Sequence, residues 1–269
     1  MVVFPNAKIN LGLDITEKRP DGYHNIESVF VPVPIYDALE IIQNDENKTK
    51  FSSTGIEIPA DGKSNLVERV FSIIQSKYQI PTVDIELLKQ IPIGAGLGGG
   101  SADAAACVLS LNKIFDLQLS EKELLNLASQ LGADCAFFIK NEIMYVEGIG
   151  NEFTHINLDL SKYHFVVVYP NIHVSTADAY KHITPQKPSR NIREILAKPI
   201  EKWKNELKND FEISVFKQYP KIKKVKNQLY DYGAIYASMS GSGSAVFGIF
   251  KNDPKTNFKD LGKSWNFTL

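Results

Sequence analysis

The sequence predicts a protein that mixes α-helices and β-strands, in one large domain or two modest ones. Its 269 residues are 43% hydrophobic, which is enough for a substantial core. An extended apolar segment over 83–93 leads into a glycine-rich loop, and an alanine-rich helical pattern follows over 102–111. Near the C-terminus, two apolar strands over 234–250 flank a second glycine- and serine-rich turn. Both strands and helices are therefore expected in each half of the chain.

Composition and charge limit the classes of partner. The formal net charge is −1, so the chain has no overall basic field that would attract nucleic acid. Cys107 and Cys135 lack metal-ligand spacing and are typical of a reducing compartment. The N-terminus resembles no signal peptide, and no apolar run reaches the roughly 18 residues that span a membrane. We expect a soluble cytoplasmic protein without nucleic-acid or membrane partners, a monomer or a weak homodimer.

The first element is a strand over Ala7–Leu13. Ile9, Leu11 and Leu13 alternate with Lys8, Asn10 and Gly12, and period-two alternation predicts a strand with one buried face. Lys8 and Asn10 are then expected side by side on its open face. An ordinary surface strand would show the same pattern, so this segment alone does not predict a site.

Antiparallel strands and a capped helix are expected next. Asp21-Gly22 is a turn signal, Tyr23-His24 follow it directly, and apolar runs extend over 28–35 and 38–42. Ser64-Asn65 precede apolar residues at helical spacing as far as Ile74, so they are expected to cap a helix.

The glycine-rich loop predicts an anion site. Five of the chain's 17 glycines fall between Gly94 and Gly100. The order strand, glycine loop, helix presents backbone N–H groups and the positive end of a helix to an anion, most commonly a phosphate. Gly94, Gly96 and Gly99 fit G-x-G-x-x-G, but no second strand ending in an acidic residue follows as a dinucleotide fold requires. No Gly-Lys-Ser/Thr closes the loop and no His-Arg-Asp follows it. A turn that merely packs backbone closely remains the alternative.

A lone carboxylate follows the next predicted helix. Ser120 to Glu123 form a capping box, and the helix that they open ends before Asp134 in Leu131-Gly-Ala-Asp-Cys135. Asp134 lies between apolar residues. A cap for the next turn and a catalytic base are both compatible with its position.

The C-terminal half is expected to form a second domain. Segment 158–162 resembles a boundary, which predicts domains over 1–157 and 158–269. The apolar strand His164–Tyr169 is typical of a strand buried on both faces. Helical patterns over 192–197, 201–208, 211–218 and 222–230 precede a hairpin whose connection is Ser240-Gly-Ser-Gly-Ser244. The tail beyond Lys255 is weakly patterned.

Three segments together are more specific than any one of them. Ala7-Lys-Ile-Asn-Leu11, Pro92-Ile-Gly-Ala-Gly-Leu-Gly-Gly-Gly-Ser-Ala-Asp103 and Ser240-Gly-Ser-Gly-Ser244, in this order, resemble the three motifs of the GHMP small-molecule kinases. The resemblance covers about residues 5–250. It implies ATP-dependent phosphorylation and a two-domain α+β fold. The N-terminal domain would be like domain 2 of ribosomal protein S5, and the C-terminal domain ferredoxin-like.

Further detail resembles one branch of that superfamily. Lys8-x-Asn10 combined with Asp21-Gly-Tyr-His24, Leu131-Gly-Ala-Asp134 and Val174-Ser-Thr176 is similar to the kinases of the non-mevalonate isoprenoid pathway. These phosphorylate the 2-hydroxyl of a methylerythritol unit that carries a cytidine diphosphate. The Asp-Gly-Tyr-His turn and the Lys-x-Asn strand are the discriminating parts, because the glycine loop is shared across the superfamily.

The resemblance implies a role for each candidate residue. Asp134 would accept the proton of the substrate hydroxyl. Lys8 would orient Asp134 and this hydroxyl, and would offset charge on the transferring phosphoryl group. We hypothesise that Tyr23 stacks on the cytosine, that His24 bonds its edge, and that Tyr180 closes the other ring face. Asn10 and Thr176 would hold the sugar alcohol and diphosphate. ATP would be bound by the loop residues and two candidates for its adenosine end: Pro92, Ile93, Gly94, Ala95, Gly96, Leu97, Gly98, Gly99, Gly100, Ser101 and Ala102, with Asn65 and Lys89. The third motif is Ser240, Gly241, Ser242 and Gly243.

Two questions stay open from the sequence. Mg²⁺ is implied by ATP chemistry, but no carboxylate pair is evident as its ligand. The nearest alternative function is another GHMP kinase, acting on homoserine or a mevalonate derivative, for which a base-stacking Tyr23 has no use. A non-catalytic nucleotide- or RNA-binding module is the alternative from another class, and the lack of basic bias argues against it.

Overall fold

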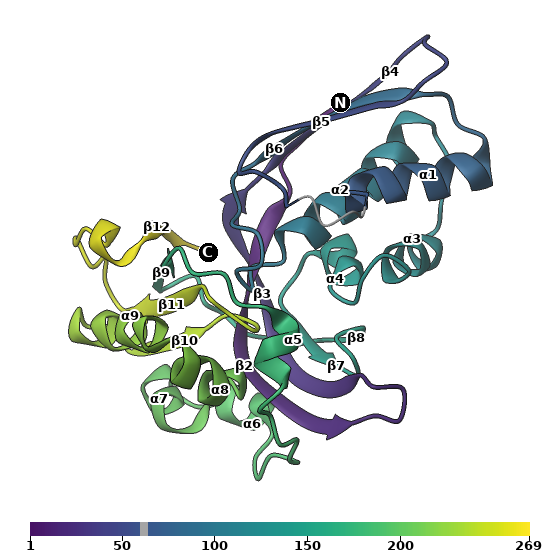
Figure 1. The fold of residues 1–269 in the computed structure, drawn as a ribbon. Helices are drawn as coiled ribbons and strands as arrows, with labels where there is room; N and C mark the ends of the chain where they lie inside the picture. The colour runs from purple at the N-terminus through teal and green to yellow at the C-terminus, as the bar shows by residue number, and fades with distance from the viewer. Residues whose placement is uncertain (60–63) are drawn as a thin grey trace. The chain divides into compact units, whose positions relative to one another are not determined.

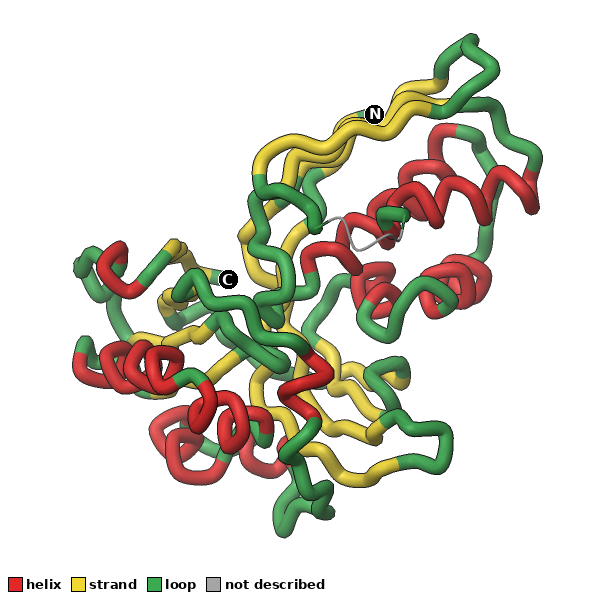
Figure 2. The backbone as a smooth tube through the Cα atoms, viewed as in Figure 1, coloured by secondary structure: helices red, strands yellow, loops and turns green. Residues whose placement is uncertain are grey.

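The computed structural model describes residues 1–59 and 64–269, which form two compact units of mixed helices and strands (Figures 1 and 2). The first unit contains residues 1–7, 35–93 and 98–142, and the second contains 8–34, 94–97 and 143–269. Both units are discontinuous in sequence. Residues 8–34 group with the C-terminal half, and the domains predicted over 1–157 and 158–269 stay a prediction.

The first unit is built on a four-stranded sheet of order β1-β4-β6-β5. Its strands are β1 (Val2–Val3), β4 (Ala38–Gln43), β5 (Lys50–Gly55) and β6 (Val83–Lys89). β4 and β6 run antiparallel and pair Leu39 with Leu87, while β5 runs parallel to β6. The alternation of Val83, Ile85 and Leu87 buries these side chains on one face, as predicted.

Helices accompany this sheet in the same unit (Figure 1). They are α1 (Leu66–Tyr78), α2 (Gly99–Ile114), α3 (Glu121–Ser129) and α4 (Cys135–Lys140). Asn65 and Ser120 form capping boxes with Glu68 and Glu123, so both predicted caps are confirmed. α2 buries residues on most of its faces, as its apolar pattern predicted.

The second unit contains two four-stranded sheets. One has the order β2-β3-β7-β8, with β2 (Asn6–Lys18), β3 (His24–Tyr36), β7 (Met144–Glu147) and β8 (Glu152–His155). The other is antiparallel in the order β10-β11-β9-β12, with β9 (His164–Tyr169), β10 (Tyr236–Met239), β11 (Val246–Phe250) and β12 (Lys263–Thr268). The predicted hairpin over 234–250 is therefore β10 and β11.

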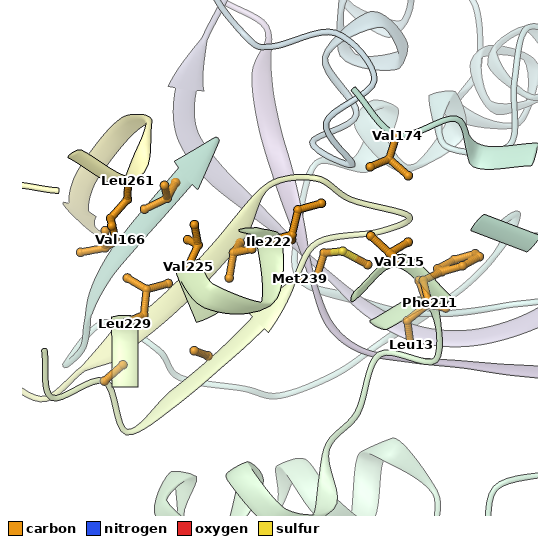
Figure 3. Close-up of a cluster of buried hydrophobic side chains, with 14 of the residues drawn as sticks. Leu13, Val166, Val174, Phe211, Val215, Ile222, Val225, Leu229, Met239 and Leu261 are labelled. Carbon is orange, nitrogen blue, oxygen red and sulfur yellow. The ribbon is translucent and has the colours of Figure 1, made fainter. Parts of the chain in front are cut away.

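Short helices complete the second unit. They are α5 (Thr176–Tyr180), α6 (Ile192–Leu196), α7 (Trp203–Glu206), α8 (Phe211–Gln218) and α9 (Pro220–Asp231), with 3₁₀ turns at Ile200–Lys202 and Lys259–Leu261. Figure 3 shows the core that α8 and α9 form with the second sheet. Ile222, Val225 and Leu229 lie at helical spacing in α9 and are at most 2% exposed. Burying a side chain of this size contributes about 1.5–3 kcal/mol.

The weakly patterned tail forms a strand that the sequence did not reveal. β12 pairs with β9 from Lys263 opposite Tyr169 to Thr268 opposite His164. β9 therefore lies between β11 and β12, and its residues 165–168 are fully buried, as its continuous apolar run predicted. Among the described residues, no helix is both long enough and apolar enough to cross a bilayer.

Candidate active site

Strand β2 buries the lysine and the amide that were predicted on its open face. Lys8 is 3% exposed and Asn10 is 1% exposed, so the expectation of an open polar face was wrong. The cause lies in the same unit, where polar partners from other segments cover this side of the strand. A buried cation and amide require such partners, because burial without hydrogen bonds is costly.

A chain of hydrogen bonds runs from Lys8 through the sheet. Lys8 Nζ donates to Asn10 Oδ1 at 2.7 Å, and Asn10 Nδ2 donates to Ser28 Oγ at 3.0 Å. Ser28 Oγ in turn donates to the carbonyl of Gly12 at 2.6 Å. The ammonium of Lys8 also lies 4.4 Å from the centroid of the Phe30 ring. These contacts fix the position of the charge, which acts more strongly in an apolar surrounding than in water.

The third motif contacts both the lysine strand and the glycine loop. Ser240 Oγ lies 3.3 Å from Asn10 Oδ1 and donates to the carbonyl of Gly96 at 2.8 Å. Backbone bonds join the same segments, from Lys8 N to Leu97 O at 2.9 Å and from Ala245 N to Ala95 O at 3.0 Å. The second unit therefore brings together the three segments whose order in the sequence suggested a site.

The close approach of these segments explains the glycine at position 96. Its φ is +77°, a left-handed conformation that side chains disfavour. A Cβ atom there would lie 2.0 Å from the carbonyl oxygen of Ser240. The loop can reach the third motif only without a side chain at this position.

The helix that follows the loop has an open N-terminus. α2 begins after Gly98, and within the described chain no side chain caps it and its first turn holds no acidic residue. α1 and α3 of the same unit are each closed by a capping box. The first N–H groups of a helix have no partner inside the helix, so an uncapped glycine-rich start suits an anion. Ser101 and Ala102 lie in this first turn.

The two residues predicted for the adenosine end of ATP have structural partners. Asn65 Oδ1 accepts from Val67 N at 2.8 Å as the cap of α1. Lys89 is 3% exposed and forms ion pairs with Asp37 and, at 2.7 Å, with Asp103. Burial raises the pKa of Asp103 to about 7, with Asp37 adding to the rise and Lys89 opposing it. The ammonium of Lys89 is thus committed to a buried ion-pair cluster, which argues against contact with adenosine.

Replacing Lys89 with methionine should lower the free energy of unfolding by about 3–5 kcal/mol, because two buried carboxylates would lose their counter-ion. Urea unfolding followed by circular dichroism measures this loss. The double variant K89M/D103N should recover part of it by removing one carboxylate. An unchanged stability with a raised KM for ATP would instead restore Lys89 to the adenosine site.

Two of the three aromatic residues predicted for the base are in contact. Tyr23 is 62% exposed, and the rings of His24 and Tyr180 stack at 4.5 Å with an interplanar angle of 22°. Burial lowers the pKa of His24, with Lys18 adding to the shift, which favours the neutral ring that can accept a hydrogen bond. Thr176 Oγ1 lies 3.0 Å from Ser242 Oγ of the third motif. His24 covers one face of Tyr180 here, so a base that used that face would have to displace it.

Asp134 does not serve as a helix cap. It occupies the residue before α4, but its side chain makes no cap hydrogen bond there. The structure therefore does not support the cap interpretation, and the role of Asp134 as a base stays a prediction. Across the described residues, no group of three or more His, Cys, Asp or Glu side chains is placed to hold a metal ion.

Sequence analysis missed residues whose partners are distant along the chain. Ser28 was read only as the start of an apolar run, and Asp37 and Asp103 were not singled out. Asn209 is 2% exposed and bonds to the third motif. The sequence signal for such a residue is a polar side chain inside an apolar pattern. That signal does not identify its hydrogen-bond or ion-pair partner.

Comparison with known families defines the class first. Models of the GHMP kinases match the chain in two places, the N-terminal domain model at residues 65–142 and the C-terminal model at 191–260. A homoserine kinase structure from Cytophaga hutchinsonii shares the fold, with a TM-score of 0.68 and 18% identity over 97% of this chain and 93% of that one. The α+β fold is that of the GHMP kinases, and the two models cover the glycine loop and the segment Ser240–Ser244.

Relatives with higher sequence identity show which GHMP kinase family the chain belongs to. A 4-diphosphocytidyl-2-C-methyl-D-erythritol kinase of Bacteroides fragilis is 51% identical over 99% of this chain and 98% of its own. One of Parabacteroides distasonis is 48% identical over 97% and 94%. A crystal structure of 4-(cytidine 5'-diphospho)-2C-methyl-D-erythritol kinase has a TM-score of 0.84 and 30% identity over 99% and 98%. The chain belongs to the 4-diphosphocytidyl-2-C-methyl-D-erythritol kinase family.

Proposed function

We propose that this chain transfers the γ-phosphoryl group of ATP to the 2-hydroxyl of 4-diphosphocytidyl-2-C-methyl-D-erythritol. The observation that supports this substrate is the stacked pair of rings, His24 and Tyr180, with the exposed Tyr23 next to His24 in sequence, in the unit that holds Lys8. Aromatic faces are what a nucleobase requires, and homoserine and mevalonate have no base. Relatives that carry this name across the whole chain support the same choice.

ATP is proposed to bind through the glycine loop and the start of α2. The support is the uncapped helix N-terminus and the side-chain-free backbone before it. Backbone N–H groups and the positive helix end would hold the phosphates, and Ser101 would add a hydroxyl. The third-motif loop would border the same backbone, since Ser240 bonds to Gly96.

The proposed reaction needs a base and a cation. The substrate oxygen forms a bond to the γ-phosphorus, the bond from that phosphorus to ADP breaks, and the hydroxyl proton passes to Asp134. Lys8 offsets the negative charge on the transferring group, held in position by Asn10. A base of this kind contributes about 10²–10⁴-fold. Asn10 is assigned this positioning role, and its contact with substrate remains a prediction.

Mg²⁺ is proposed to enter with ATP. This cation prefers phosphate oxygens and water to a cage of protein side chains, which agrees with the absence of a carboxylate cluster in the described residues. When bound, it would neutralise phosphate charge. A cytoplasmic location is part of the proposal, supported by two buried cysteines that form no disulfide.

An ATP-consumption assay on a panel of acceptors tests the function. We expect turnover with 4-diphosphocytidyl-2-C-methyl-D-erythritol and little with free methylerythritol phosphate, mevalonate or homoserine. Preference for mevalonate or homoserine would replace the proposal with another GHMP activity. No turnover with any acceptor, together with nucleotide binding, would favour a non-catalytic module.

Replacing Tyr23 with alanine should raise KM for the cytidyl substrate about tenfold or more, because stacking on one base is worth ~1–3 kcal/mol. KM for ATP should change little. Tyr36→Ala is the matched control, since Tyr36 is also exposed, at 47%, but lies in the other unit. An unchanged KM for the cytidyl substrate in Tyr23→Ala would refute the stacking role.

A further inference from the structure

Four consecutive residues at the start of α8 contact both halves of the proposed site in the second unit. We call Asn209-Asp210-Phe211-Glu212 the anchor segment. Its side chains bond to the third-motif loop, to strand β2 and to the aromatic pair. None of the four was a candidate from the sequence.

The third-motif loop is held by two members of the anchor segment. Asn209 Nδ2 donates to the carbonyls of Met239 at 2.7 Å and Gly241 at 2.9 Å. Glu212 Oε1 accepts from the backbone N–H of Met239 at 2.9 Å. Gly241 has φ +52°, and a glycine-rich loop has little stiffness of its own. Bonds from the anchor segment therefore add to the loop's own backbone bonds, Ser240 N to Ala245 O and Gly243 N to Ser240 O, in fixing Ser240 beside Gly96.

Capping of α8 does not account for Asn209. Its Oδ1 accepts from Phe211 N at 3.0 Å, which is a local turn bond of the kind found at helix starts. Its amide nitrogen is not needed for that bond, yet it donates to two carbonyls of a distant segment. An amide with two donors matches two acceptors there, and a shorter hydroxyl would reach at most one.

The base-binding side is contacted by the other two members. The Phe211 ring lies 4.8 Å from the Tyr180 ring in an edge-to-face arrangement at 86°. Tyr180 in turn stacks on His24. Asp210 Oδ2 accepts from Ile15 N at 2.8 Å, which ties the same segment to the strand that carries Lys8.

We propose that the anchor segment is a positioning element, in which Asn209 sets the third-motif loop against the glycine loop and Phe211 sets the aromatic pair for the base. The inference rests on the proposed function, because it uses the two substrates as readouts. If the proposal holds, a substitution of Asn209 changes KM for ATP, and a substitution of Phe211 changes KM for the cytidyl substrate.

Steady-state kinetics of Asn209→Ala and Phe211→Leu with both substrates test this. N209A should lower kcat and raise KM for ATP, each about tenfold, with KM for the cytidyl substrate within twofold of wild type. F211L should raise KM for the cytidyl substrate about three- to tenfold, the size of an edge-to-face contact, with KM for ATP unchanged. Val225→Ala is the control, because Val225 is 2% exposed in the same core but belongs to α9 and lies outside the anchor segment.

The outcomes separate the two proposals. Folded N209A and F211L that lose only as much melting temperature as V225A, with all constants normal, would overturn the anchor role, and so would equal shifts of both KM values in both variants. If N209A does not fold, Asn209→Ser keeps one donor and should show the same split at smaller size; a serine variant with wild-type constants would overturn the role. A wild-type protein that is inactive on the cytidyl substrate would instead refute the proposed function.

Discussion

Replacing Lys8 with methionine should lower kcat by about 10²–10³-fold, as the loss of a fixed charge facing a transition state does. Methionine keeps an apolar stem of similar length and removes the ammonium, which donates to Asn10 and lies over the Phe30 ring. KM for ATP should stay near the wild-type value, because the phosphates are proposed to be held by backbone. Stopped-time assays with saturating substrates measure the effect.

A matched control exists for this substitution. Lys263 lies 5.1 Å above the Trp265 ring on strand β12, so Lys263→Met removes a lysine over an aromatic ring away from the motif segments. It should leave kcat unchanged. A K8M protein with normal turnover would remove Lys8 from the mechanism.

Replacing Asp134 with asparagine should lower kcat by about 10²–10⁴-fold, the contribution of a positioned base. Asparagine has the same shape and cannot accept the proton. Because asparagine keeps the shape of the side chain and no cap bond to α4 is lost, we expect the loss of kcat to exceed any loss of melting temperature. Differential scanning fluorimetry beside the kinetics separates loss of chemistry from loss of fold.

Asp159→Asn is the control for charge removal, since the Asp159 carboxylate bonds Ser161 at the surface and should not affect turnover. The double variant K8M/D134N adds a second test. If both residues act on one step, the double loss should be much smaller than the product of the single losses. Fully multiplicative losses, or a cap-like loss of stability in D134N with normal kcat, would argue against the assigned roles.

Local signals in the sequence predicted most of the elements that carry the site. The glycine loop between β6 and α2, the capping boxes at Asn65 and Ser120, and the β10–β11 hairpin all follow from short-range spacing. Such patterns depend on residues only a few positions apart, so a single amino-acid sequence is enough to predict these elements. The resemblance to the GHMP kinases rested on the same segments, and the family comparisons confirm it.

Long-range pairings could not be predicted in the same way. The polar face of β2 looked open because its partners Ser28 and Ser240 are separated from it by up to 230 positions. Lys89 appeared available for ATP because its two carboxylates come from other elements. Burial of a charge depends on what covers it, and alternation along one strand carries no information about that.

The C-terminal tail and Asn209 illustrate the same limit. β12 has no clear alternation, and it forms a strand because β9 offers it a free edge. The side-chain amide of Asn209 donates to carbonyls that lie 30 and 32 positions away. In both cases the partner, and not the segment itself, determines the structure.

The most direct test of the central claim is the ³¹P NMR spectrum of the product formed from ATP and 4-diphosphocytidyl-2-C-methyl-D-erythritol. Transfer to the 2-hydroxyl predicts one new phosphomonoester resonance, retention of the cytidyl diphosphate signals and one equivalent of ADP. Inorganic phosphate as the new signal, or loss of the cytidyl diphosphate, would contradict the account.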